Sequence, residues 1–169
     1  MLRLSALVLV AAVASPALAQ EPKGCDAFKW PVAREHALLR TATATKPSGT
    51  EFADASSAEA VRIALQPIES AKLPMPPERS PRAPSTFAGF VTFAKVGQPG
   101  LYAVSLSDNG WIDVIQGGIY LKPLAFSGAT GCDGLRKTVK FRLESGPLTI
   151  QVTGVAGGSI AVSVTPFAN

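Results

Sequence analysis

The segment TVKFRL, from Thr138 to Leu143, alternates apolar and polar residues with a period of two. Val139, Phe141 and Leu143 fall on one face of such a strand, and the residues between them fall on the other. Strict alternation is typical of a β-strand that packs one face on a core and exposes the other to water. We therefore expect the polar face, which includes Thr138, to lie in solvent.

Seven further segments carry a strand signal, with bulky apolar residues at alternate positions or on both faces. They cover residues 59–66, 87–94, 101–106, 111–115, 119–124, 148–152 and 160–164. Most connections are a few residues long, and parallel pairing needs crossovers that this half of the chain lacks. The prediction is an all-β fold: an antiparallel β-sandwich or jelly roll of about eight strands, preceded by one short N-terminal helix.

The segments before and within the strand region differ in character. Residues 20–58 form an expected N-terminal arm, with the helix near residues 31–40, where Pro31 suits a first turn. Residues 59–169 form the expected sandwich domain. Within it, residues 67–84 hold six prolines, which exclude a helix or a central strand. We expect a Pro-rich connector running extended over the surface, with a recognition segment as the alternative.

The first nineteen residues, MLRLSALVLVAAVASPALA, predict a secretory signal peptide. Arg3 precedes an apolar run that ends at Pro16, and small residues then suit cleavage between Ala19 and Gln20. The run is short for a hydrocarbon core of roughly 30 Å, so we set aside a retained anchor and expect no stable membrane insertion after cleavage. The predicted location is the periplasm or the exterior.

Net charge and cysteine content indicate which partners and cofactors to expect. The formal charge of +4 is mild and no run of Lys and Arg occurs, so nucleic acid is not a predicted partner. Cys25 and Cys132 are the two cysteines, and an even pair in an exported chain predicts a disulfide that ties the arm to the sandwich. No CxxC motif or histidine cluster accompanies either cysteine, so we predict no metal site and no cofactor.

Three stretches resemble the bacterial pre-peptidase C-terminal type of β-sandwich: residues 100–114, 138–154 and 159–166. The positions that match its pattern are Gly100, Tyr102, Asp113, Val139, Phe141, Leu143 and Gly146. Pro147 stands where that family has a tyrosine. The resemblance covers residues 86–166. It implies a small secreted accessory module, of a kind that in some members binds glycans or assists a neighbouring enzyme.

Groups able to carry catalysis are scarce. His36 is the only histidine and no G-x-S-x-G motif occurs, so a Ser-His-Asp hydrolase is not predicted and His36 is interpreted as structural. Metal-dependent dioxygenases of the jelly-roll type place two or more histidines on inner strands. A single histidine outside the strand region argues against that class of enzyme. The remaining enzymatic hypothesis is a carboxylate pair drawn from Asp108, Asp113 and Asp133.

The predicted ligand-binding set surrounds a tight turn. Trp111 follows the turn and is predicted to face a ligand, with capping of the core as the alternative. Asp108, Asp113 and Arg136 complete the set. Asp108, Asn109 and Asp113 supply too few oxygens for calcium, so we prefer a plain turn. A basic row could meet an anionic glycan or lipid headgroup or simply be solvated; its members are Arg136, Lys137, Lys140 and Arg142.

The sequence therefore predicts an exported, non-enzymatic module that binds an unknown ligand, possibly a glycan or a protein, or that has a structural role. A small secreted hydrolase with an unrecognised carboxylate site is the alternative.

Overall fold

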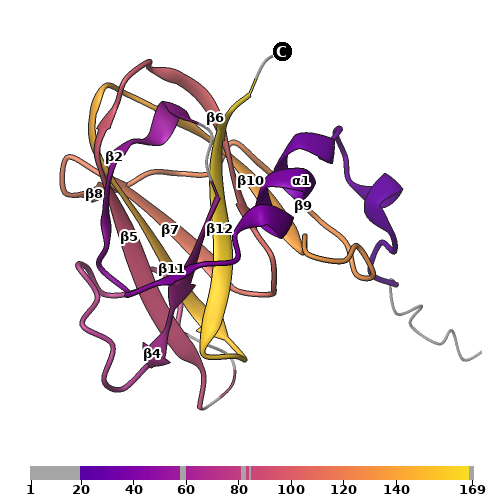
Figure 1. The fold of residues 1–169 in the computed structure, drawn as a ribbon, viewed down its shortest axis with the longest axis horizontal. Helices are drawn as coiled ribbons and strands as arrows, with labels where there is room; N and C mark the ends of the chain where they lie inside the picture. The colour runs from indigo at the N-terminus through magenta and orange to yellow at the C-terminus, as the bar shows by residue number, and fades with distance from the viewer. Residues whose placement is uncertain (1–19, 58–59, 81–82, 84, 168–169) are drawn as a thin grey trace, which may run out of the picture.

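Two β-sheets pack face to face in the computed structural model, which describes residues 20–57, 60–80, 83 and 85–167 (Figure 1). The predicted signal peptide and its Ala19 cleavage position lie outside these residues. The first sheet has the order β1-β3-β12-β6-β10-β9, and the second has the order β2-β5-β11-β7-β8, with β4 also paired to β5. The all-β sandwich expected from the strand pattern is confirmed.

The first sheet is built from β1 (Thr45–Lys46), β3 (Ala60–Ala64), β12 (Ser159–Pro166), β6 (Gly100–Leu106), β10 (Lys137–Leu143) and β9 (Ala125–Gly128). The second is built from β2 (Glu51–Asp54), β5 (Phe87–Val96), β11 (Gly146–Val155), β7 (Trp111–Gln116), β8 (Ile119–Tyr120) and β4 (Gln66–Pro67). One α-helix, α1 (Ala33–Thr41), and two 3₁₀ turns, η1 (Cys25–Ala27) and η2 (Ala55–Ser57), complete the described elements.

The main core lies between the sheets. Apolar side chains at alternate strand positions, such as Val91, Leu143 and Ile150, are completely buried there. Burial of one such side chain contributes roughly 1.5–3 kcal/mol. The inward face predicted for residues 138–143 is confirmed, since Phe141 is 1% exposed and Val139 belongs to the same cluster.

The arm departs from the expected loop. It supplies β1 and β2, which pair in parallel with β3 and β5, so both sheets are mixed rather than purely antiparallel. Parallel pairing needs a long crossover. The chain between β1 and β3 and the much longer chain between β2 and β5 provide it, whereas the C-terminal half pairs antiparallel as expected.

Two further strand expectations need correction. The strand expected at residues 119–124 ends at Tyr120, because Leu121 to Leu124 cross from the edge of the second sheet to that of the first. Pro123 within this crossing has no N–H for a ladder. The chain then forms β9, a strand that none of the predicted segments includes.

The outer face of the first sheet is partly covered rather than wholly solvated: Arg142 is exposed as expected, whereas Thr138 is not. Thr138 is fully buried, and Ser105 Oγ donates a hydrogen bond to Thr138 Oγ1 over 2.9 Å. The expectation that Thr138 faces water is wrong because α1 and the arm pack on this face (Figure 1). A second apolar cluster fills the contact; it includes Phe28, Val32, Leu39, Ala129, Cys132, Leu135 and Ala161.

Candidate functional site

A buried carboxylate lies on the outer face of the second sheet. Asp113, in β7, is 1% exposed. Trp111 Nε1 donates to Asp113 Oδ1 over 2.6 Å. Gln151 Nε2 and the backbone N–H of Glu78 donate to Oδ2 over 3.1 and 3.4 Å. The strand register explains the first partners, since Gln151 of β11 lies directly opposite Asp113 and Trp111 shares its face two residues away.

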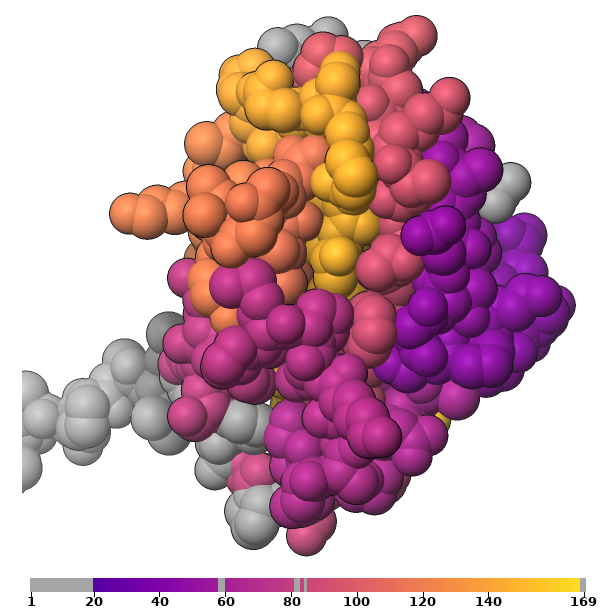
Figure 2. Space-filling model, turned by 90° about the vertical axis from the view of Figure 1, so that its left-hand side faces the viewer, coloured from indigo at the N-terminus to yellow at the C-terminus, as the bar shows by residue number. Residues whose placement is uncertain are grey.

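The Pro-rich connector covers this carboxylate. The N–H of Met75 donates to Gln151 Oε1 over 3.4 Å, and Tyr120 Oη donates to the carbonyl of Pro76. Figure 2 shows the connector, in magenta, lying across the lower part of this face. A hollow of about 490 Å³ lies on the connector itself; it is lined by Ile68, Ala71, Leu73, Pro74, Met75, Pro76, Pro77 and Ser80. Asp113 lies beneath the connector and does not line the hollow.

Burial dominates the electrostatics around Asp113. Desolvation raises the pKa of its carboxyl, and the three hydrogen-bond donors oppose that rise. Burial also lowers the pKa of Lys137, with Arg136 and Arg79 acting in the same direction. Arg79 Cζ lies 5.1 Å and Lys137 Nζ 5.9 Å from the centre of the Trp111 ring. Trp111 is therefore engaged by its indole N–H and by two cationic neighbours.

The predicted ligand-binding set is divided. Trp111 and Asp113 lie together, whereas Asp108 sits in the exposed β6–β7 turn and accepts from the N–H of Asn109 over 2.6 Å. Arg136 forms an ion pair with Glu21 over 2.8 Å. The calcium alternative gains no support, because the Asp113 oxygens accept three N–H groups. A ligand-binding role for these residues stays a prediction.

The basic row is also divided between faces. Lys137 lies on the Val139 side of β10 and donates to the carbonyl of Gly110, while Lys140 and Arg142 lie on the other face. On that other face, Lys140 lies against the rings of Trp30 and Phe167.

We define the aromatic–lysine surface as Lys29, Trp30, Phe126, Lys140 and Phe167. Lys140 Nζ lies 4.2 Å from the centre of the Trp30 ring and 3.4 Å from that of Phe167. Those two rings make an edge-to-face contact with centres 6.2 Å apart. Lys29 Nζ lies 4.9 Å from the centre of the Phe126 ring. β9 pairs Phe126 with Val139, so the Phe126 side chain lies on the Val139 side of the sheet, whereas Lys140 lies on the other face with Trp30 and Phe167. The two cation–ring groups thus lie on either side of the sheet edge formed by β9.

An exposed ring and two lysines that have no acidic partner in the described part of the chain characterise this surface. Phe126 is 63% exposed, because β9 is the edge strand of its sheet. Among the described residues, neither Lys29 nor Lys140 has a carboxylate oxygen within 4.0 Å, whereas Lys95 and Arg136 are paired with acids. The positive charge of the two lysines is therefore available to an anion.

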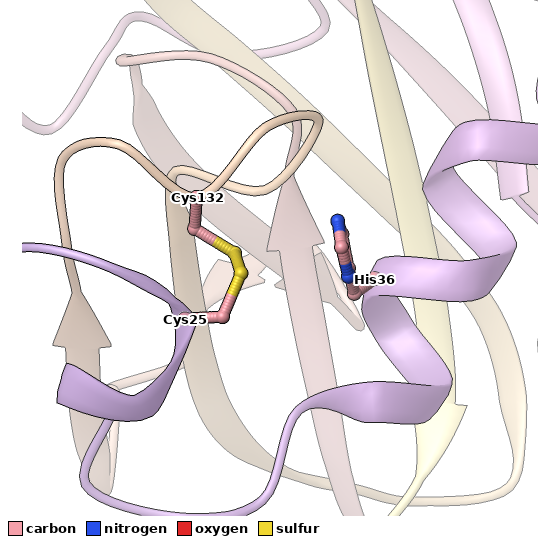
Figure 3. Close-up of side chains that lie close together, drawn as sticks. All are labelled: Cys25, His36 and Cys132. Atoms are coloured by element: carbon pink, nitrogen blue, oxygen red, sulfur yellow. A yellow bond between two sulfur atoms is a disulfide. The ribbon is translucent and has the colours of Figure 1, made fainter.

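A third cluster surrounds the disulfide. Cys25 and Cys132 are bonded, as predicted, and their Cα atoms lie 4.7 Å apart. His36, on α1, faces them, and its ring nitrogen and the two sulfurs lie within 4.8 Å of one another (Figure 3). His36 Nε2 lies 2.6 Å from the carbonyl oxygen of Asp133. The expectation that no histidine accompanies the cysteines is therefore wrong for the folded chain. It holds only for their neighbours in the sequence.

Sequence reasoning missed the groups that the arm brings to the sandwich. Phe126 sits in a four-residue strand, too short to show a period, and Lys29 and Trp30 precede a helix whose docking face no local pattern reveals. The single detectable signal was the predicted disulfide. A bridge from Cys25 to Cys132 already requires residues near position 30 to lie close to residues near position 130.

Comparison of the chain with protein-family models, curated proteins and solved structures returned no match. Among the described residues, no helix has the length and apolar character needed to cross a bilayer. The disulfide is typical of proteins that work outside the reducing cytosol.

Proposed function

We propose that this protein is an exported, non-enzymatic binding module whose ligand is an acidic glycan held on the aromatic–lysine surface. The single observation that carries the proposal is the exposed Phe126 ring beside the unpaired Lys29 at the edge of the first sheet. Lys140, between two further rings, lies on the other face of the same sheet. A flat apolar ring suits the face of a sugar, and an unpaired ammonium group suits its carboxylate or sulfate.

The site chemistry favours binding over hydrolysis. Asp113 is buried beneath the connector, Asp108 lies in an exposed turn, and Asp133 lies in the loop beside the disulfide. Glycosidases need two carboxyl groups about 5–10 Å apart across an open cleft. Two hollows on the described surface lack such a pair, since one is lined by Asp26 alone among acids and the other by none.

Export is part of the proposal. The predicted signal peptide directs the chain to the periplasm or the exterior, and the disulfide suits either location. The resemblance to secreted pre-peptidase C-terminal modules points the same way, and accessory binding is the role that it implies.

The test is titration of the mature protein with polygalacturonate, heparin and neutral dextran, followed by calorimetry. We expect binding to the acidic polymers that weakens with added salt, and an affinity lower by about tenfold or more for Phe126→Ala or Lys29→Gln. Ile119→Ala and Lys72→Gln are matched controls, because Ile119 is equally exposed on the other sheet and Lys72 lies on the connector. Absence of binding, or equal losses in the controls, would overturn the proposal.

A further inference from the structure

We propose that the reduced form of Cys25 and Cys132, together with His36, is a binding site for a thiophilic metal ion, Zn(II) or Cu(I). Disulfide formation and metal binding then exclude each other. The inference starts from the three donor atoms, which lie within 4.8 Å of one another although they come from positions 25, 36 and 132 (Figure 3).

The donor set has the right chemistry. Thiolate sulfur and imidazole nitrogen are the ligands that zinc and cuprous copper prefer. Zinc–sulfur bonds of about 2.3 Å and zinc–nitrogen bonds of about 2.0 Å place neighbouring donors roughly 3.5–3.8 Å apart. Closing on an ion therefore requires the two sulfurs to separate after reduction and the imidazole to approach them, with solvent completing the coordination of zinc.

The Asp133 carbonyl fixes the tautomer of His36 in a form that suits a ligand. A carbonyl oxygen only accepts, so the 2.6 Å contact with Asp133 requires His36 Nε2 to carry the proton. The neutral ring then keeps its lone pair on Nδ1. Metal-binding histidines characteristically donate the other ring N–H to a carbonyl or carboxylate, which fixes the ring and its tautomer.

The cysteines have reason to stay together after reduction. Backbone hydrogen bonds from Gly24 to Thr130 and from Thr130 to Pro22, each 2.8 Å, tie the arm to the Cys132 loop. The N–H of Lys29 donates to Ser127 Oγ over 2.9 Å. The apolar cluster around Phe28 and Leu135 adds to this docking. The arm thus has contacts on both sides of Cys25 that do not depend on the sulfur–sulfur bond.

The cluster is also reachable. A hollow of about 560 Å³ runs along the arm, and its lining includes Cys25, Asp26 and His36. A small dithiol can enter there. It delivers two electrons and two protons, so the sulfur–sulfur bond breaks, two S–H bonds form, and the dithiol becomes a disulfide. When the metal binds, each thiol releases its proton to solvent.

The experiment compares oxidised and reduced mature protein under anaerobic conditions. Zn(II) is measured by competition with a chromophoric chelator, Cu(I) by competition with a bidentate indicator, and Co(II) by its thiolate charge-transfer absorption. We expect one ion per reduced chain and none in the oxidised chain. Equal binding by the two forms would overturn the proposal, as would failure of both metals to bind the reduced form.

Variants separate ligation from structure. Cys25→Ser with Cys132→Ser should abolish binding, and His36→Gln should weaken it about tenfold or more, since even loss of an outer-shell partner costs 10–100-fold. The Gln amide can still donate to Asp133, so packing is conserved. Near-ultraviolet circular dichroism checks that the reduced chain is folded. Loss of the folded signal on reduction, or unchanged affinity in His36→Gln, would contradict the site.

Discussion

At the scale of the residue, Asp113 shows how hydrogen bonds offset the cost of burying a carboxylate on a covered sheet face. Its carboxylate is removed from water but retains three N–H donors. An unpaired buried charge would be strongly destabilising, whereas a paired one costs much less. The remaining cost of burial appears as the raised pKa.

This shift predicts a pH dependence of the free energy of unfolding. The folded pKa of Asp113 lies above its ordinary value of 3.8. Stability linked to the neutral carboxyl is therefore complete below pH 3.8 and is lost as pH rises through the folded pKa. Asp113→Asn removes this loss. In urea denaturation between pH 4 and 7, the free energy of unfolding of the variant should increase relative to that of the wild type as pH rises.

Trp111→Phe is a second variant for the same urea denaturation series. It removes the 2.6 Å donor, which should raise the pKa of Asp113 further and move the loss of stability to higher pH. The free energy of unfolding of Asp113→Asn relative to wild type should rise with pH. If this difference stayed constant or shrank with rising pH, the pH dependence would not come from Asp113.

At the scale of the element, α1 is fixed to the first sheet by a buried hydrogen bond. Thr165 Oγ1 donates to Glu35 Oε1 over 2.6 Å, with Thr165 fully buried and Glu35 5% exposed. Thr165→Val keeps the shape but leaves the carboxylate without this donor. We expect a loss of about 2–3 kcal/mol in the free energy of unfolding, typical of a hydrogen bond to a charged group.

Thr165→Ser is the matched control for that prediction, because it keeps the hydroxyl and removes only a methyl group. Chemical denaturation of the three proteins at neutral pH is sufficient. If Ser and Val at position 165 were equally destabilising, packing rather than the hydrogen bond would hold the helix.

The elements also show how far the sequence could predict this fold. Strands with a full alternating pattern, such as β10 and β12, were predicted within two residues of their ends, because their period reflects burial of a whole face. β1 and β2 were missed. They are short, their residues are exposed or half-buried, and each has one neighbouring strand, so no periodic burial marks them.

The candidate sites were less predictable than the strands. The proximity of Trp111 and Asp113 follows from their spacing on one strand, and the disulfide follows from the cysteine count. The approach of His36 to that disulfide, and of Lys29 to Phe126, depends on where the arm docks. The position of the arm depends on tertiary contacts with buried polar and apolar residues on the outer face of the first sheet. The alternating pattern alone predicts that this face is exposed to solvent.

At the scale of the whole molecule, the disulfide and the strand pairing of the arm act on different parts of the chain. β1 and β2 belong to the sheets and cannot leave without breaking ladders. The arm before β1 only lies on the outside of the first sheet. The bridge joins this outer segment to the Cys132 loop, across a separation of 107 residues.

Reduction should therefore have a global and a local effect. The chain-entropy model assigns roughly 4–5 kcal/mol to a loop of this length, so the urea midpoint should fall clearly after reduction. Because the arm keeps its hydrogen bonds and apolar contacts, the sandwich should remain folded without denaturant. Hydrogen exchange should show amides of residues 24–41 losing protection first, since their opening leaves the sheets intact. If β5 and β11 lost protection together with the arm, the arm would be part of one cooperative unit, and a reduced but still assembled Cys25–His36–Cys132 cluster could not persist.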